Sequence, residues 1–267
     1  MTYQTTIIKL EGYGQWTLGL GSDREYSLQI LQSKIYAELQ ELFSDKNGIV
    51  FSNRFDEFIA VTNKIDIDSH RKIHEQVSRN NEKIDISMTI GVDKTPLRSN
   101  KNAHYAKNKK ECLIVPNIYA THDNKSSKVK AIHAKTRTAD DGDDDYIKIL
   151  HIDINDSTAI TKNLSSYETT NIIINLYSKI SNIFLKEECL TFYLGGDNFM
   201  ALAEENITTE KVKEMVNLIT TLTKIKLNCG IGVGTTGRKA AEMATKSLDK
   251  IRELRRNGTI VNVYESY

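Results

Sequence analysis

The chain has 267 residues, of which 39% are hydrophobic and 27% are charged, so it holds enough apolar material for a packed core and is not a disordered polypeptide. Its 36 lysines and arginines balance 35 aspartates and glutamates, which excludes a strongly basic nucleic-acid binder or membrane-surface protein. Three cysteines without a Cys-x-x-Cys pair argue against a disulfide framework or a cysteine-rich zinc site.

Targeting signals are missing from the sequence. No stretch of about 18 apolar residues occurs, so we expect no transmembrane helix. The first residues carry charge early and lack the apolar run of a signal peptide. We therefore predict a cytoplasmic protein with no nucleic-acid partner and no membrane partner.

The first half of the chain predicts a regular succession of elements. Runs of β-branched residues predict strands, and apolar residues three or four apart predict amphipathic helices. The expected strand, helix, hairpin, helix and strand lie at residues 6–11, 28–42, 49–61, 67–80 and 86–91. Residues 97–110 are polar with little apolar period, and the sequence leaves open whether they form a frayed helix or a loop.

A polar segment separates the two halves. Residues 121–145 end in an acidic run, which predicts a solvated inter-domain linker. A calcium-binding loop is the alternative, but the EF-hand spacing and its closing glutamate are missing. The predicted domains are therefore 1–120 and 146–267.

The second half repeats the first. Its strand, helix, hairpin, helix and strand, followed by a helix and a last strand, are expected at residues 147–154, 173–184, 190–202, 209–224, 229–232, 238–254 and 259–264. Glu11 and Asp56 are 45 residues apart, and Asp153 and Asp197, which we take as their equivalents, are 44 apart. The sequence predicts an α+β fold of two tandem ferredoxin-like (βαββαβ) domains, with antiparallel sheets and helices packed on one face.

The acidic residues of each half are expected to converge. In a βαββαβ unit the end of the first strand and the turn of the hairpin lie at one edge of the sheet. Asp153 should therefore meet Asp197, and Glu11 should meet Asp56. Two converging carboxylates repel unless a cation such as Mg²⁺ neutralises them. The Gly-Gly pair at 195–196 lets a phosphate approach the backbone, so the sequence predicts a site for a metal and a nucleoside triphosphate.

These segments resemble a known family. The stretches 151–155 and 195–201 are similar to palm-type nucleotide cyclase and polymerase domains. The stretch 10–16 (LEGYGQW), the hairpin residues 54–56 (RFD) and the segment 230–232 (GIG) resemble, more specifically, the archaeal GTP cyclohydrolase III family, which also has two tandem palm-like units. The resemblance covers nearly the whole chain except 97–145.

The resemblance implies an activity. The family opens the imidazole ring of GTP hydrolytically, giving a formamidopyrimidine ribonucleotide monophosphate and two phosphates, a step that feeds deazaflavin and flavin synthesis in archaea. It requires Mg²⁺ and is stimulated by a monovalent cation such as K⁺. We accordingly expect GTP as the ligand and a homo-oligomer as the assembly.

The residue pattern and the resemblance together suggest roles for individual residues. We expect Asp153 and Asp197 to hold the metal, and Asp56 or Glu11 to act as general base toward the water that attacks C8 of guanine. The residues expected to contact the nucleotide are Arg54, Phe55, Asn155, Gly195, Gly196, Asn198, Arg238 and Lys239. Two positions depart from the family pattern, because Glu11 stands for an aspartate and Gly12 for an asparagine.

Two other functions stay open at this point. A nucleotidyl or diguanylate cyclase would use the same rim carboxylates, although such cyclases carry a glutamate where this chain has Asn198. A GTP sensor without catalysis would follow if the departures at Glu11 and Gly12 had removed turnover. A zinc mechanism is not expected, since His151 and the other histidines are scattered.

Overall fold

The computed structural model describes residues 2–22, 24–109, 112–121 and 146–266. Apart from residue 121, the predicted linker and its calcium-loop alternative lie outside the described residues. The first half contains β1 (Tyr3–Glu11), α1 (Tyr13–Gly19), α2 (Glu25–Ser44), β2 (Ile49–Arg54), β3 (Glu57–Val61), α3 (Ile67–Asn80), β4 (Asp85–Asp93), α4 (Pro96–Ala106), β5 (Leu113–Val115) and β6 (Ile118–Ala120). The second half contains β7 (Ile147–Ile154), α5 (Ser157–Thr161), α6 (Ser166–Lys186), β8 (Leu190–Gly195), β9 (Asn198–Ala203), α7 (Thr209–Thr223), β10 (Leu227–Gly234), α8 (Gly237–Arg256) and β11 (Val263–Ser266).

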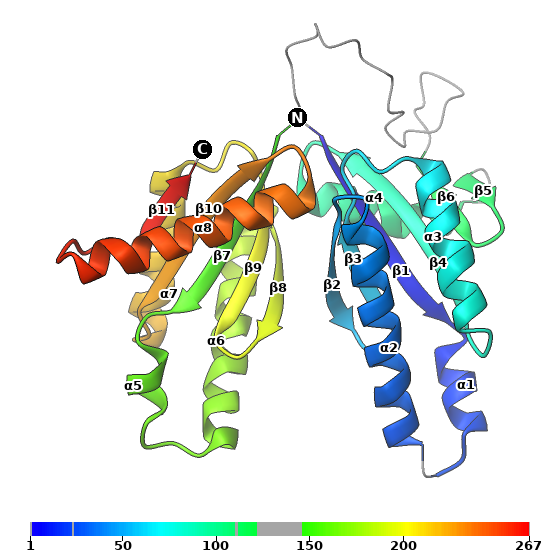
Figure 1. Ribbon diagram of the computed structural model, residues 1–267, viewed down its shortest axis with the longest axis horizontal. Coiled ribbons are helices and arrows are strands. Elements are labelled where there is room, and N and C mark those ends of the chain that lie inside the picture. Colours follow the sequence, from blue (N-terminus) through cyan, green and yellow to red (C-terminus); the bar gives the residue numbers. More distant parts are fainter. Residues whose placement is uncertain (1, 23, 110–111, 122–145, 267) are drawn as a thin grey trace, which may run out of the picture.

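Each half has its own sheet, and the predicted α+β fold of two antiparallel-dominated sheets is confirmed (Figure 1). The strand order is β2-β3-β1-β4-β6-β5 in the first half and β11-β10-β7-β9-β8 in the second. Only the pairs β4–β6 and β10–β11 are parallel among the described strands. No helix among the described residues is long and apolar enough to cross a membrane.

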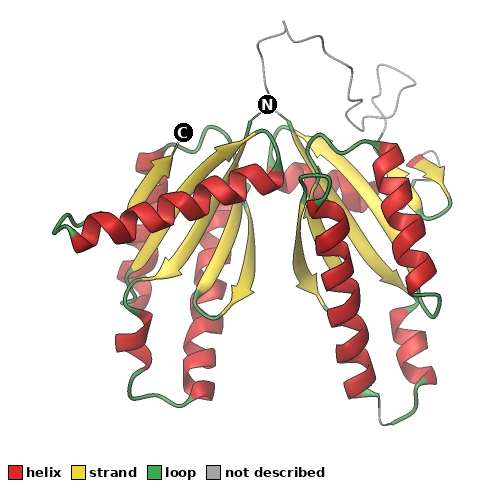
Figure 2. Ribbon diagram, viewed as in Figure 1, coloured by secondary structure: helices red, strands yellow, loops and turns green. Residues whose placement is uncertain are grey.

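Helices cover both faces of each sheet (Figure 2). The predicted pair in each half, α2 with α3 and α6 with α7, packs on one face and encloses that half's core. A third helix, α4 or α8, lies against the opposite face of the sheet, where strand glycines bring the backbones together. The expectation of helices on one face therefore describes α2, α3, α6 and α7 but not α4 and α8.

Helix α4 occupies the stretch that the sequence left undecided. Thr95 caps it, since its hydroxyl accepts a hydrogen bond from the Arg98 backbone N–H at 3.3 Å, and Pro96 occupies the first turn. Its buried face consists of small residues, Pro96, Ser99, Ala103 and Ala106. A face of small residues produces no strong hydrophobic period, and this is why the sequence did not predict the helix.

The two halves share a third hydrophobic core. Phe51 of β2 stacks on Phe192 of β8 with ring centroids 4.1 Å apart and planes 4° from parallel. The contacts on either side are reciprocal: the Arg238 N–H donates to Asn47 O at 3.1 Å, and the Leu97 N–H donates to Glu188 O at 3.0 Å. The repeat detected in the sequence is therefore also a pseudo-two-fold arrangement in space.

Candidate active site

The rim of the second half is built around Asp153, which lies one residue before the end of β7 and is only 4% exposed. It lies opposite Asn198 on β9 and Asn228 on β10. Asn228 Nδ2 donates to Asp153 Oδ1 at 2.8 Å, and Arg252 Nη2 donates to Asp153 Oδ2 at 2.7 Å. The buried carboxylate thus has one neutral and one charged donor, which hold it in a fixed orientation.

The hairpin that carries Asp197 meets this rim, as predicted. Gly195 and Gly196 adopt φ values of 105° and 59°, a conformation that L side chains rarely take, so the turn requires glycine there. Asn198 Nδ2 donates to Asp197 Oδ1 at 2.9 Å. Because Asn198 pairs with Asp153 in the sheet register, Asp197 is one residue away from a direct cross-strand neighbour of Asp153.

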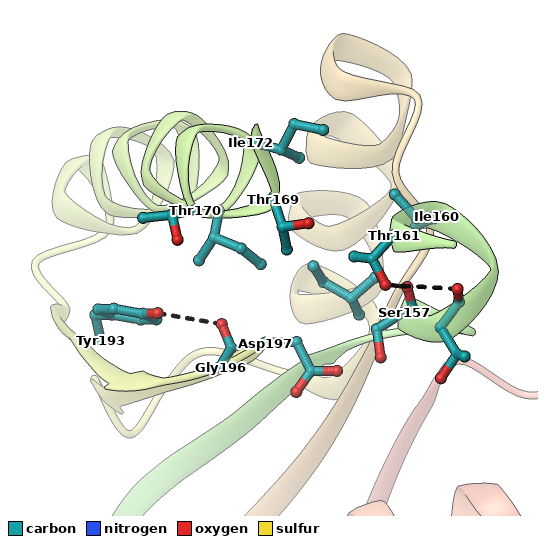
Figure 3. Close-up of a pocket in the computed structure, with 12 residues that line it drawn as sticks. Ser157, Ile160, Thr161, Thr169, Thr170, Ile172, Tyr193, Gly196 and Asp197 are labelled. Carbon is teal, nitrogen blue, oxygen red and sulfur yellow. Dashed lines mark hydrogen bonds between the residues drawn. The ribbon is translucent and has the colours of Figure 1, made fainter. Parts of the chain in front are cut away.

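A cavity of about 360 Å³ opens beside Asp197 (Figure 3). Thr169 and Thr170 of α6 lie across it from Gly196 and Asp197 of the hairpin. Tyr193 closes one side and donates from its hydroxyl to Gly196 O at 3.2 Å. Hydroxyl groups, a backbone turn and one carboxylate suit a polar ligand with an aromatic or planar part.

His151 is a structural member of the rim. Its Nδ1 lies 3.1 Å from Thr245 Oγ1 and its Nε2 lies 3.2 Å from Asn198 Oδ1. Burial lowers the pKa of His151 below its ordinary value, outweighing the opposing effect of its hydrogen bond to Asn198. The imidazole is therefore neutral near pH 7, and it orients Asn198 beside Asp197.

The donor set of this rim fits Mg²⁺ better than zinc. Asp153 and Asp197 supply hard carboxylate oxygens, and Mg²⁺ in proteins is commonly held by one or two carboxylates together with substrate phosphates. No group of three or more His, Cys, Asp or Glu side chains in the described part of the chain could hold a metal by itself.

The rim of the first half differs in its charges. The backbone N–H of Leu10 donates to Asp56 O at 2.9 Å, so Glu11 and Asp56 are at one edge as predicted. Burial of Glu11 raises its pKa, but hydrogen bonds from Lys107 and Ser87 outweigh this and lower the pKa below its ordinary value. Glu11 is therefore ionised at neutral pH and paired with Lys107.

The strand register corrects one equivalence. Lys9 lies opposite Glu57 on β3 and Ser87 on β4, and Asp153 lies opposite Asn198 and Asn228 on the corresponding strands. The structural equivalent of Asp153 is therefore Lys9, and matching Glu11 with Asp153 was wrong by two residues. The error arose because the chain between the first strand and the hairpin is longer in the first half. Choosing Glu11, two residues after Lys9, therefore gave a spacing to Asp56 close to the spacing between Asp153 and Asp197.

The predicted site residues fall into three groups. Asn155, Gly195, Gly196 and Asn198 lie on the same rim as Asp153 and Asp197. Arg54, Phe55, Asp56 and Glu11 lie on the rim of the first half. Each cavity described here is lined by one half only, so none of them joins these two groups.

Arg238 and Lys239 form the third group and lie away from both rims. They begin α8, whereas Arg252, near the end of that helix, reaches Asp153. Arg238 Nη1 donates to Ser44 O at 3.1 Å and so joins the two halves, and Lys239 pairs with Glu242 at 3.1 Å. Their expected phosphate contact has no support in this arrangement.

Sequence reasoning missed the partners of Asp153. Arg252 is 99 residues away in the chain and Asn228 is 75 residues away, and neither belongs to a recognisable motif. Asn228 stands in an apolar strand two residues before Gly230, and a lone amide in such a strand was the one available signal.

Comparison with known proteins agrees with the sequence analysis. Residues 1–265 match the family model of GTP cyclohydrolase III. The GTP cyclohydrolase III of Methanocaldococcus jannaschii is 35% identical over 259 residues, covering 93% of this chain and 88% of that protein. That of Methanothermobacter thermautotrophicus is 33% identical over 250 residues, with 93% and 94% covered. An EAL/GGDEF domain protein from M. capsulatus aligns in structure with a TM-score of 0.37 and 15% identity, covering 46% of this chain and 86% of that one.

Proposed function

Because the chain belongs to the GTP cyclohydrolase III family, we propose that it hydrolyses GTP, opens the imidazole ring and releases a formamidopyrimidine ribonucleotide monophosphate and two phosphates. The family match over residues 1–265 carries this proposal. The rim of Asp153 and Asp197 beside a cavity with both polar and apolar walls supports it, since a nucleoside triphosphate needs both a metal-binding edge and a pocket for its base.

Asp153 and Asp197 would hold Mg²⁺ in this proposal. The metal, when bound, neutralises phosphate charge and polarises the phosphorus toward water. Asn228 and Arg252 orient the Asp153 carboxylate, and His151 orients Asn198 next to Asp197. K⁺ as an activator rests on the family resemblance alone.

The cavity would receive the guanine base. The hydroxyls of Thr169 and Thr170 and the backbone of Gly196 supply hydrogen-bonding groups along its walls. Asp56 and Glu11, predicted from the sequence as the general base, lie on the rim of the first half and do not line this cavity, so the proposal assigns no general base for the site beside Asp197. Arg54 and Phe55 belong to that same rim and are taken up below.

The test is product analysis combined with substitution. Purified protein incubated with GTP, Mg²⁺ and K⁺ should yield a ring-opened monophosphate and inorganic phosphate, identified by mass spectrometry. Asp153→Asn and Asp197→Asn should each lower the Mg²⁺-dependent rate about 10²- to 10³-fold, since each removes several kcal/mol of charge stabilisation.

Asp249→Asn is the matched control. Asp249 accepts from Arg252 Nη1 at 2.9 Å but is an exposed residue outside the rim, so its loss should leave the rate within a few-fold of wild type. A cyclic or dinucleotide product would contradict the proposal and assign the reaction to the 3′-hydroxyl. Wild-type turnover in Asp153→Asn would contradict the metal assignment.

A further inference from the structure

The first half contains its own counterpart of the substrate cavity. A cavity of about 490 Å³ lies between α2 and the β2–β3 hairpin, lined in part by Tyr13, Gln29, Gln32, Ser33, Ser52 and Phe55. The sheet register shows the correspondence: Ser52 pairs with Phe58, as Tyr193 pairs with Phe199 in the second half. Tyr193 and Ser52 thus occupy equivalent places on the walls of two equivalent cavities.

The lining of this cavity has the chemistry of a nucleobase site. Phe55 is 74% exposed at the hairpin, where it offers a face for stacking. Gln32 Nε2 donates to the Tyr13 hydroxyl, and Gln29 and Ser33 line the same wall of α2. Glutamine amides donate and accept at once, which suits the mixed edges of a purine.

The charges near this cavity differ from those of the catalytic rim at one decisive position. Where the second half has the buried carboxylate Asp153, the first half has Lys9. Lys9, Arg54 and Lys107 line a further cavity of about 520 Å³ that also includes Asn53 of the hairpin.

The hairpin residues lie between these two cavities, since Phe55 lines one and Arg54 lines the other. A base beside Phe55 would therefore have its phosphates near cations. Glu11 pairs with Lys107, and Asp56 and Glu57 pair with Arg54, while Lys9 adds a third cation at the position where the second half has Asp153. This rim can accept a phosphate directly, without a divalent metal to offset a carboxylate.

We propose that the first half binds a second purine nucleotide without a divalent metal and without turning it over. The base would stack on Phe55 in the cavity of α2, and the phosphates would lie beside Lys9 and Arg54. The proposal rests on the proposed function in one respect, because the ligand class is taken from the equivalence of the two cavities.

Calorimetric titration of the full chain tests the proposal, with GTP as the probe. Wild-type protein should bind two equivalents of GTP with Mg²⁺ and one equivalent with EDTA. Phe55→Ala should raise the dissociation constant of the GTP bound in EDTA about 5- to 150-fold, the range expected from losing one stacking contact. Tyr26→Ala is the control, since Tyr26 is an exposed aromatic of α2 that is 60% exposed and does not line the cavity; it should leave both equivalents unchanged.

A second variant separates the two sites. The double variant Asp153→Asn with Asp197→Asn should still bind one equivalent of GTP in EDTA. It should no longer bind the additional equivalent that wild-type protein binds with Mg²⁺. A single equivalent in Mg²⁺ and none in EDTA would overturn the proposal, as would loss of the EDTA equivalent in the double variant. If GTP yields no ring-opened product while the EDTA equivalent persists and depends on Phe55, the proposed function fails and the second site stands.

Discussion

Asp153 shows how single residues build the rim. Its side chain is 6% exposed and pairs with Arg252, whose side chain is 45% exposed. A buried carboxylate is stable only when donors or a cation replace its water. Asn228 and Arg252 fulfil that need without a metal, and they hold the carboxylate in one orientation on the rim.

Arg252→Gln should therefore lower the free energy of unfolding in EDTA by about 1–3 kcal/mol, because Asp153 loses its charged donor. Excess Mg²⁺ and GTP should restore most of the difference, since binding to the native state neutralises the carboxylate again. Urea unfolding under both conditions measures this. Arg256→Gln, an exposed change on the same helix, should be neutral, and an equal loss under both conditions would contradict the argument.

At the scale of elements, helix α8 is held close to its sheet by glycines. A Cβ added to Gly232 would lie 2.0 Å from the Ala244 backbone nitrogen, and one added to Gly230 would lie 2.2 Å from Ala244 O. Gly91 makes the same close approach to Ala103 of α4. The short spacing places Arg252 within reach of Asp153, so packing in the middle of α8 affects the site near its end.

Gly232→Ala should destabilise the protein by about 3 kcal/mol, since backbone atoms must move to admit the methyl group. The same displacement should weaken Mg²⁺-dependent activity by moving Arg252. Gly19→Ala is the control, because no atom lies within 4 Å of the place its methyl group would take, and it should stay within about 0.5 kcal/mol of wild type. Thermal unfolding and the product assay measure both effects, and a stable Gly232→Ala variant would disprove the close packing.

At the scale of the whole molecule, the two halves form one folded unit through their edge strands. The core between them includes Phe51, Val61, Ile149 and Phe192, all buried. The contacts that flank it come from the first residues of α4 and α8. Since each half supplies the same kind of residue to this core, the pseudo-two-fold arrangement buries what would be an exposed apolar edge in a single unit.

Phe51→Ala and Phe192→Ala should each cost about 3–5 kcal/mol in the free energy of unfolding. The double variant should cost about 1 kcal/mol less than the sum, because the stacked pair is lost only once. Phe51→Ala combined with Phe184→Ala, which lies in the separate core of the second half, should be additive. Additivity in both cycles would show that the rings do not couple the halves.

Much of the fold and part of the site could be predicted from the sequence. Local patterns predicted the strands except β5 and β6, the long helices, the glycine turn at 195–196 and the tandem repeat, because periodicity records which face of an element is buried. The meeting of Asp153 with the Asp197 hairpin followed from the topology of the repeat. Helix α4 was undecided because its buried face is made of small residues.

Only the tertiary structure decided the register and the long-range partners. Register depends on cross-strand pairing, so it alone placed Lys9 at the position of Asp153. Arg252 reaches the rim because glycines let α8 pack closely on its sheet, and Arg238 joins the halves because α8 begins beside Asn47. These outcomes depend on how whole elements pack against one another, and a one-dimensional pattern of residue types does not contain that information.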